Sequence, residues 1–315
     1  MNMMPVGVDL AKNIFRMHYV NGETGEVVNR SIKRANFLEH FANLEPCLIG
    51  MEAGGGAHHW ARELTKIGHE VKLMSGRFVK AFNIGNKNDA GDAKAIWLAV
   101  QQPVKSVGIK TEMQQAMLSL HRMREQLVKF RTMQINGLRG LLAEYGEVFP
   151  AGRPGLNKGM SAALSRLSEI LPGVLIDSLR TQWSRIKQLD EEIQTIEHQL
   201  QEWKKEDATV NAISKIPGVG LLGATAAVAI IGDPKSFKSG REFSAYLGLV
   251  PKQKGSGGKV QLQGISKRGD TYLRKLLIHG ARSVLANSKS PGEWVEDLKK
   301  RKPFNVNTHK LREIV

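Results

Sequence analysis

The sequence is that of a basic protein with an ordinary globular composition. Its 315 residues include 46 Lys and Arg against 30 Asp and Glu, which gives a formal net charge of +16. At roughly 150 residues per domain, this length allows about two domains, each able to bury a core without disulfides. The single cysteine, Cys47, excludes an intramolecular disulfide and a cysteine-based zinc site. The positive charge favours a polyanionic partner, and nucleic acid is the first candidate.

The sequence also favours a protein of the reducing cytoplasm. No apolar run approaches the ~18 residues that a membrane-spanning helix needs. Residues 1–9 lack the basic segment and apolar core of a secretory signal peptide. We therefore expect no membrane partner.

Residues 4–100 predict alternating strands and helices. Short apolar or alternating segments, typical of strands, are separated by turn signals such as Asn21-Gly22 and Thr24-Gly25. The expected order is three strands, near 5–10, 15–19 and 27–28, then a helix at 37–44, a strand at 47–51, a helix at 57–67, a strand at 71–74 and a helix at 89–100. This order favours a mixed sheet with helices on both faces.

Residues 111–205 predict long helices and contain no good strand. Apolar residues at helical spacing run from Met117 to Leu142, and this helix carries many cations with few acids. A second helix has apolar residues spaced as a heptad seam: Ile186, Leu189, Ile193, Ile196, Leu200 and Trp203. The seam predicts either packing against a helix of the same chain or a coiled coil that joins subunits.

The last hundred residues predict a third region. A helix at 221–231 follows the turn Pro217-Gly218-Val219-Gly220, which resembles a helix-hairpin-helix turn. Gly218 and Gly220 would then bring backbone N–H groups close to a phosphate. A Gly- and Lys-rich loop is expected over 252–269, before a helix at 270–286. From Lys252 to Arg282 the chain is densely basic, and Asp270 is its one acid.

Four acids lie where strands end or a helix begins. Asp9 and Glu52 each follow an apolar strand, and Asp89 and Asp92 lie three residues apart at the start of a helix. Mg²⁺ prefers carboxylate oxygens and takes waters and substrate phosphates as its other ligands. For Asp89 or Asp92 alone, helix capping is the simpler interpretation. The four acids together favour a metal site.

This order of acids resembles the RuvC-like nucleases of the RNase H superfold. Further motifs resemble the transposases of the insertion-sequence 110 group, and Ser256-Gly257-Gly258-Lys259 resembles its 1111 subgroup. These motifs occupy residues 7–12, 51–55, 87–93, 216–220, 246–251 and 264–270. The resemblance covers nearly the whole chain, in the right order and spacing.

The resemblance implies a recombinase, a transposase of a mobile element, guided by a structured bridge RNA that pairs with target and donor DNA. The implied fold is α/β plus α. A RuvC-like domain at 1–105 precedes a helical, coiled-coil region at 106–205 for RNA binding and oligomerisation, and a mostly helical transposase domain spans 206–315. The implied protein is a homo-oligomer, a dimer or a tetramer on DNA, associated with the bacterial nucleoid.

The catalytic residues that the resemblance implies are Asp9, Glu52, Asp89, Asp92 and Ser256. The four acids would bind Mg²⁺, with Mn²⁺ as an alternative. Ser256 would attack a phosphodiester and hold one DNA end as a phosphoserine, and its flanking glycines would let the backbone approach the phosphate. Ser266 is the competing nucleophile, although its place before a basic pair and a helix favours a phosphate contact.

Nucleic-acid contacts are expected from two further groups of residues. Cations near Ser256 would stabilise charge that develops on the phosphate, and these are Lys254, Lys259, Lys267 and Arg268. Cations of the first long helix would hold RNA by its backbone, and these are Arg122, Lys129, Arg131 and Arg139.

Three alternatives use the same residues differently. A RuvC-like nuclease would cut structured DNA with water and leave Ser256 inert. A site-specific DNA invertase would share these motifs, and a non-catalytic nucleic-acid-binding protein would use the acids structurally. A covalent protein–DNA adduct distinguishes the recombinase, because a hydrolase leaves free ends and a binding protein cuts nothing.

Overall fold

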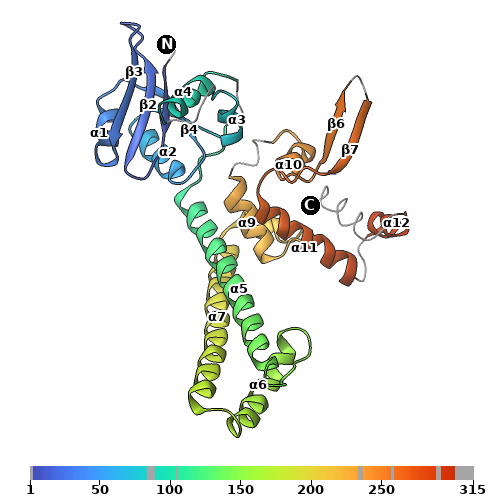
Figure 1. The fold of residues 1–315 in the computed structure, drawn as a ribbon. Helices are drawn as coiled ribbons and strands as arrows, with labels where there is room; N and C mark the ends of the chain where they lie inside the picture. The colour runs from blue at the N-terminus through green and yellow to red at the C-terminus, as the bar shows by residue number, and fades with distance from the viewer. Residues whose placement is uncertain are drawn as a thin grey trace. The chain divides into compact units, whose positions relative to one another are not determined.

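The computed structural model describes residues 3–83, 89–103, 106–232, 237–256, 259–288 and 292–301, without the side chains of residues 89, 90, 256, 260, 294 and 298. Contacts divide the chain into two compact units, Met1–Thr111 and Glu112–Val315 (Figure 1). The predicted boundary between residues 205 and 206 falls inside the second unit and stays a prediction.

The first unit is built on one five-stranded sheet. Its strands are β1 (Met4–Asp9), β2 (Ile14–Val20), β3 (Val27–Lys33), β4 (Cys47–Glu52) and β5 (Glu70–Met74), in the order β3-β2-β1-β4-β5. β1, β2 and β3 pair antiparallel, whereas β4 pairs parallel with both β1 and β5. The predicted mixed sheet is therefore confirmed.

Helices cover both faces of this sheet. The short 3₁₀ turn Arg34–Asn36 leads into α1 (Phe37–Ala42), which packs with α2 (Ala57–Lys66) on one face. There the rings of Phe15, Phe37 and Trp60 meet edge to face at 4.8–5.3 Å. On the other face, α3 (Gly76–Lys80) and α4 (Asp89–Val100) share a second core with β5.

α4 lies very close to the sheet because glycines occupy the positions beneath it. A Cβ on Gly7 would lie 2.4 Å from the Ala93 carbonyl oxygen, and a Cβ on Gly50 would lie 2.7 Å from the Val100 Cβ. The register of β1 and β4 pairs Gly7 with Gly50. The helix backbone therefore rests directly on these two strands.

The second unit begins with a long helical hairpin (Figure 1). α5 (Glu112–Ala143) and α7 (Gly173–Glu206) run antiparallel, and α6 (Arg153–Ser168) lies between them in sequence. The heptad seam packs within the chain, since Ile186 shares a core with Leu138 of α5, and Trp203 shares one with Met117. This is the first of the two predicted alternatives.

The rest of the second unit follows the helical hairpin in the chain. Its helices are α8 (Ala208–Ile213), α9 (Leu221–Ile231), α10 (Gly240–Tyr246), α11 (Thr271–Asn287) and α12 (Glu293–Arg301). The predicted helices at 221–231 and 270–286 are confirmed. None of the helices in the described ranges is long and apolar enough to cross a membrane.

The prediction of a loop over 252–269 is wrong for most of that range. β6 (Pro251–Ser256) and β7 (Lys259–Ile265) form an antiparallel hairpin there. The described side chains of both strands are exposed or half-buried, so the hairpin needs no buried apolar face. It therefore lacks the apolar alternation by which a strand is predicted.

We predict that Gly7→Ala destabilises the first unit by about 1–3 kcal/mol, because the new methyl group overlaps the backbone of α4. Calorimetry should show a lower melting temperature for this unit. Gly22→Ala is the matched control, since a Cβ there meets no atom within 4 Å. Equal melting temperatures for the two variants would contradict the close contact.

Candidate functional site

Two of the predicted acids lie at the ends of neighbouring parallel strands. Asp9 ends β1 and Glu52 ends β4, and the ladder pairs Val8 with Met51, so the acids follow paired positions. Since side chains alternate along a strand, both acids lie on the face that α4 covers. This edge, at the carboxyl ends of parallel strands, is where α/β sheets place ligand sites.

The surroundings of the acids differ. The exposed Glu52 carboxylate reaches the start of α3, where a Cβ on Gly76 would lie 2.4 Å from its Oε1 atom. Asp92 is half-buried in the first turn of α4, and the Asn83 side-chain amide donates a hydrogen bond to it. Asp9 lies opposite Arg16 in the antiparallel ladder.

The complete set of four acids stays a prediction. Asp89 is the first residue of α4, but its side chain lies outside the described residues. Among the side chains that are described, no three of His, Cys, Asp or Glu gather closely enough to hold a metal ion. The donor set fits a hard divalent cation, because Asp9, Glu52 and Asp92 bring oxygen ligands to one side of the sheet.

In the second unit, two sequence motifs pack against each other. The Ser266 N–H donates to the Val250 carbonyl at 2.8 Å and links the segments 246–251 and 264–270. Glycine is required at this contact. Gly248 has φ +72°, and a Cβ there would lie 2.0 Å from the Arg268 carbonyl oxygen.

Polar contacts from α11 and its N-cap stabilise these motifs. The Arg274 side chain, only 7% exposed, donates to the Leu247 carbonyl at 2.8 Å. Asp270 caps α11 by accepting a hydrogen bond from the Leu273 N–H at 2.7 Å. The two motifs therefore form a stiff base for the hairpin between them.

The hairpin carries the predicted nucleophile. Ser256 ends β6, and the ladder pairs it with Lys259 of β7. The side chain of Ser256 and the residues 257–258 lie outside the described part of the chain. Lys254 and Lys259 are exposed, so the position of Ser256 has cations on its own strand and on the opposite strand.

Ser266, the competing nucleophile, stabilises a turn. Its Oγ accepts a hydrogen bond from the Arg268 N–H at 3.4 Å, and Lys267 between them adopts φ +53°. The Lys267 and Arg268 side chains are exposed, and both remain available for the predicted nucleic-acid contact.

The glycine turn at 217–220 connects α8 to α9. Gly218 has φ +85°, and a Cβ on it would lie 2.9 Å from the Gly280 carbonyl oxygen of α11. Gly218 therefore has a packing role, and Gly220 is the exposed residue that precedes α9. Contact between this turn and a phosphate stays a prediction.

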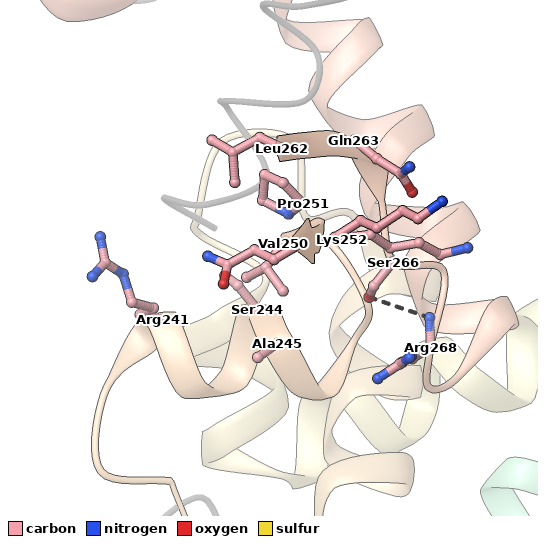
Figure 2. A pocket seen from close by; sticks show the side chains of 12 residues that line it. Arg241, Ser244, Ala245, Val250, Pro251, Lys252, Leu262, Gln263, Ser266 and Arg268 are labelled. Carbon is pink, nitrogen blue, oxygen red and sulfur yellow. Dashed lines mark hydrogen bonds between the residues drawn. The ribbon is translucent and has the colours of Figure 1, made fainter. Parts of the chain in front are cut away.

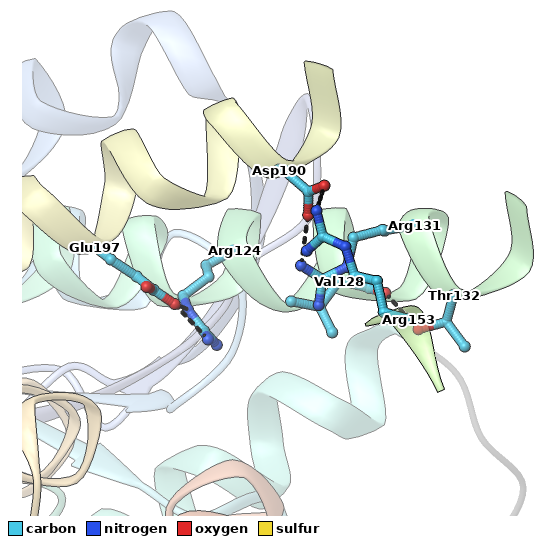
Figure 3. A network of polar contacts seen from close by, with 7 residues as sticks. All are labelled: Arg124, Val128, Arg131, Thr132, Arg153, Asp190 and Glu197. Carbon is cyan, nitrogen blue, oxygen red and sulfur yellow. Dashed lines mark hydrogen bonds and ion pairs between the residues drawn. The ribbon is translucent and has the colours of Figure 1, made fainter. Parts of the chain in front are cut away.

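The predicted cations of α5 differ in their surroundings. Arg122 and Lys129 are exposed. Arg131 instead pairs with Asp190 of α7 at 2.9 Å (Figure 3), and Arg139 donates to three backbone carbonyls in the turn after α5. Arg131 and Arg139 thus have structural roles that their residue types alone do not reveal.

Comparison with known proteins identifies the family. Residues 6–147 match a family described as "Transposase", and residues 210–294 match one described as "Transposase IS116/IS110/IS902 family". The chain is 41% identical over 318 residues to the "Probable family 20 transposase" of Pseudomonas aeruginosa, an alignment that covers 97% of this chain and 92% of that protein. The chain belongs to the IS110 family of transposases.

Two other members of the family are similarly close. The transposase for insertion sequence element IS1111A of Coxiella burnetii is 37% identical, with 95% of this chain and 84% of that protein covered. The transposase for IS1328 of Yersinia enterocolitica is 36% identical, with 97% and 92% covered. The expected enzyme class is confirmed: this is a transposase, an enzyme that cuts and rejoins DNA.

Sequence reasoning missed a buried acid in this transposase. Asp190 is 7% exposed between α5 and α7, and both Arg131 and Arg153 pair with it (Figure 3). Burial and the nearby Arg131 lower the pKa of Arg153. The one signal in the sequence was an acid directly after the seam residue Leu189.

Sequence reasoning also missed a buried histidine that joins three helices. His121 of α5 is 0% exposed, with Nδ1 2.9 Å from the Tyr272 hydroxyl of α11 and Nε2 3.0 Å from the Thr225 Oγ1 of α9. Burial, and secondarily the charge of Arg124, lower the pKa of His121 to about 4. Burial also raises the pKa of Tyr272 to about 12. Both groups are neutral at pH 7.

We predict that His121 makes the second unit less stable in acid. The unfolded chain binds a proton near pH 6.5, whereas folded His121 does so near pH 4, so stability falls as the pH decreases between these values. The loss is up to about 1.4 kcal/mol per pH unit. Calorimetry from pH 7 to pH 4.5 should show a shallower decline for His121→Gln, and parallel declines would contradict the prediction.

Proposed function

We propose that this transposase is an RNA-guided DNA recombinase that joins DNA transiently to Ser256. The main support is the placement of three acids in an enzyme that cuts DNA. Asp9 and Glu52 end neighbouring strands on the face of the sheet that α4 covers, and Asp92 lies in the first turn of α4. A second support is the positively charged hairpin that carries Ser256. It contains Lys252, Lys254 and Lys259 but no acid.

The acids and the serine would have separate tasks in this reaction. Asp9, Glu52 and Asp92, together with Asp89, would hold Mg²⁺, or Mn²⁺ as an alternative. When bound, this ion orients the phosphate and offsets its charge. The assignment of a RuvC-like domain belongs to the same proposal.

The serine step conserves the energy of the phosphodiester. The Ser256 hydroxyl releases its proton to solvent as its oxygen forms a bond to phosphorus. The bond from phosphorus to one DNA oxygen breaks, and that oxygen takes up a proton and leaves as a hydroxyl. A hydroxyl of another DNA strand later displaces the serine, which recovers its proton. No external energy source is consumed.

The helical hairpin is the proposed RNA-binding element. Arg122 and Lys129 are exposed on α5 and would contact RNA phosphates directly. Arg131 and Arg139 would instead hold the shape of that surface through their partners within the chain. The RNA would select target and donor DNA by base pairing. Dimers, or tetramers on DNA, would supply the several active sites that strand exchange at the bacterial nucleoid requires.

The second candidate is a hydrolase that uses the same acids. The acids at the sheet edge suffice for attack by water, in which case Ser256 has no chemical task. The two functions differ in whether DNA becomes covalently attached to the protein.

The deciding experiment follows this attachment with Ser256→Ala and Asp92→Asn. We expect the wild type, with its RNA and Mg²⁺, to retain labelled DNA on a denaturing gel, and each variant to lose at least about 100-fold of this adduct. Ser266→Ala is the control and should keep the adduct. DNA cleavage by Ser256→Ala at the wild-type rate would establish the hydrolase instead.

We predict that Arg122→Glu/Lys129→Glu lowers RNA affinity about 100-fold and flattens its salt dependence, because two phosphate contacts are lost. The probe is the RNA that copurifies with the protein, identified by sequencing. Arg30→Glu/Lys33→Glu on β3 changes the net charge equally and should bind RNA nearly as the wild type does. Unchanged affinity of the α5 variant would reject α5 as the RNA-binding helix.

A further inference from the structure

An open cleft of about 1080 Å³ lies between α10 and the β6–β7 hairpin (Figure 2). Its walls come from three parts of the chain: α10, the first half of β6 with the residues before it, and the segment from Leu262 to Arg268. Among the described residues that line it, none is an acid. The lining residues include four cations: Arg241, Lys252, Lys254 and Arg268.

These four cations differ from Arg124 of α5 and Arg166 of α6. Arg124 pairs with Glu197 and Arg166 with Glu147, so their charges are offset within the chain. None of the four cleft cations forms an ion pair within the described residues. Like charges that converge without an acid favour an anionic ligand.

The rest of the lining indicates a polynucleotide rather than a small anion. Val250, Pro251 and the 67% exposed Leu262 form an apolar strip beside the cations, and Gln253 and Gln263 add amide groups. An inorganic phosphate uses no apolar surface. A nucleic-acid strand presents phosphates to cations and apolar sugar and base faces to such a strip.

The cleft wall has a fixed backbone. Arg268 lies in a turn that packs closely against the segment 246–248, because Gly248 and Gly269 have no side chain. A Cβ on Gly269, at φ +107°, would lie 1.8 Å from the Tyr246 carbonyl oxygen. Lys252 lies on β6, four residues before Ser256. At about 3.3 Å per residue, this separation is about 13 Å along the strand, a distance that a few nucleotides span.

We propose that this cleft holds the DNA strand that is cut, with Arg241, Lys252 and Arg268 at its phosphates, within a few nucleotides of the bond that Ser256 attacks. The position of the cut rests on the proposed function. DNA is favoured over RNA because the cleft shares β6 with Ser256, and the family's enzymes cut DNA. Arg241 and Lys252 are therefore DNA-positioning residues.

The first test measures DNA affinity with a labelled single-stranded 20-mer. Ser256→Ala is the background, so that cleavage does not disturb the equilibrium. Arg241→Glu/Lys252→Glu should weaken binding at least about tenfold and reduce the salt slope by about 1.4, as expected when two phosphate contacts are lost. Arg30→Glu/Lys33→Glu, with the same net charge, should change both quantities little. Equal losses in both double variants would reject the cleft as the DNA site.

The second test places a thiol in the cleft. The only cysteine, Cys47, is 1% exposed, so Gln263→Cys gives the chain a single accessible thiol. A DNA 20-mer with a tethered thiol should crosslink to this position and not to Gln188→Cys, an exposed position on α7. The melting temperature of each variant checks that it is folded. Preferential crosslinking of an RNA of the same sequence would overturn the proposal.

The experiments distinguish failure of the cleft proposal from failure of the proposed function. If the cleft variants bind DNA normally while Ser256→Ala abolishes the adduct, the cleft proposal is rejected and the proposed function stands. If the cleft variants lose DNA and Ser256→Ala still forms the adduct, the cleft stands and the nucleophile is rejected.

Discussion

The candidate metal site depends on the absence of two side chains. Gly7 and Gly50 let the backbone of α4 rest on β1 and β4, and no larger residue fits without moving the helix. This contact fixes the distance between α4 and the sheet. It therefore also fixes the distance of Asp92 from the strand ends that carry Asp9 and Glu52. Asp9, Glu52 and Asp92 form a candidate site only because β1, β4 and α4, which carry them, pack together at this contact. The apolar cores on both faces of the sheet supply the attraction that closes the contact.

The same constraint recurs in the second unit. Gly248 and Gly269 allow the segments before β6 and after β7 to cross, and Gly218 allows the turn before α9 to meet Gly280 of α11. Steric exclusion therefore explains several of the glycines in the family motifs, and no ligand contact is needed for them. Exposed cations around these contacts, Lys252, Lys254 and Arg268, form no ion pair within the described part of the chain and remain for chemistry and binding.

The fold could be predicted where it follows from local patterns. Apolar periodicity predicted the bounds of α4 and α9 and the succession of five strands along the chain, because burial of one face imposes that periodicity. The β6–β7 hairpin could not be found in this way, since backbone hydrogen bonds and not apolar burial hold it. α6 was hidden because Gly152, Pro154 and Gly155 at its start are also typical of a loop.

The site could be predicted in part. Positions at strand ends placed Asp9 and Glu52 correctly at one edge of the sheet, since parallel strands end together. The partners of Arg131 and His121 could not be predicted, because those of His121 are 104 and 151 residues away and Arg131 is 59 residues from Asp190. Such contacts depend on tertiary packing, and the sequence shows only that a cation or an imidazole is present.

The ion pairs of the helical hairpin also restrict how it can change in length. Arg124 pairs with Glu197 and Arg131 with Asp190, so each helix advances by seven residues from one pair to the next. Seven residues are two helical turns, or about 10.5 Å. An insertion of one or two residues in one helix would turn the charged residues away from their partners and rotate the apolar seam out of the interface. Relatives with a longer or shorter hairpin should therefore differ from this chain by whole numbers of helical turns, such as heptads, added to or removed from both helices together.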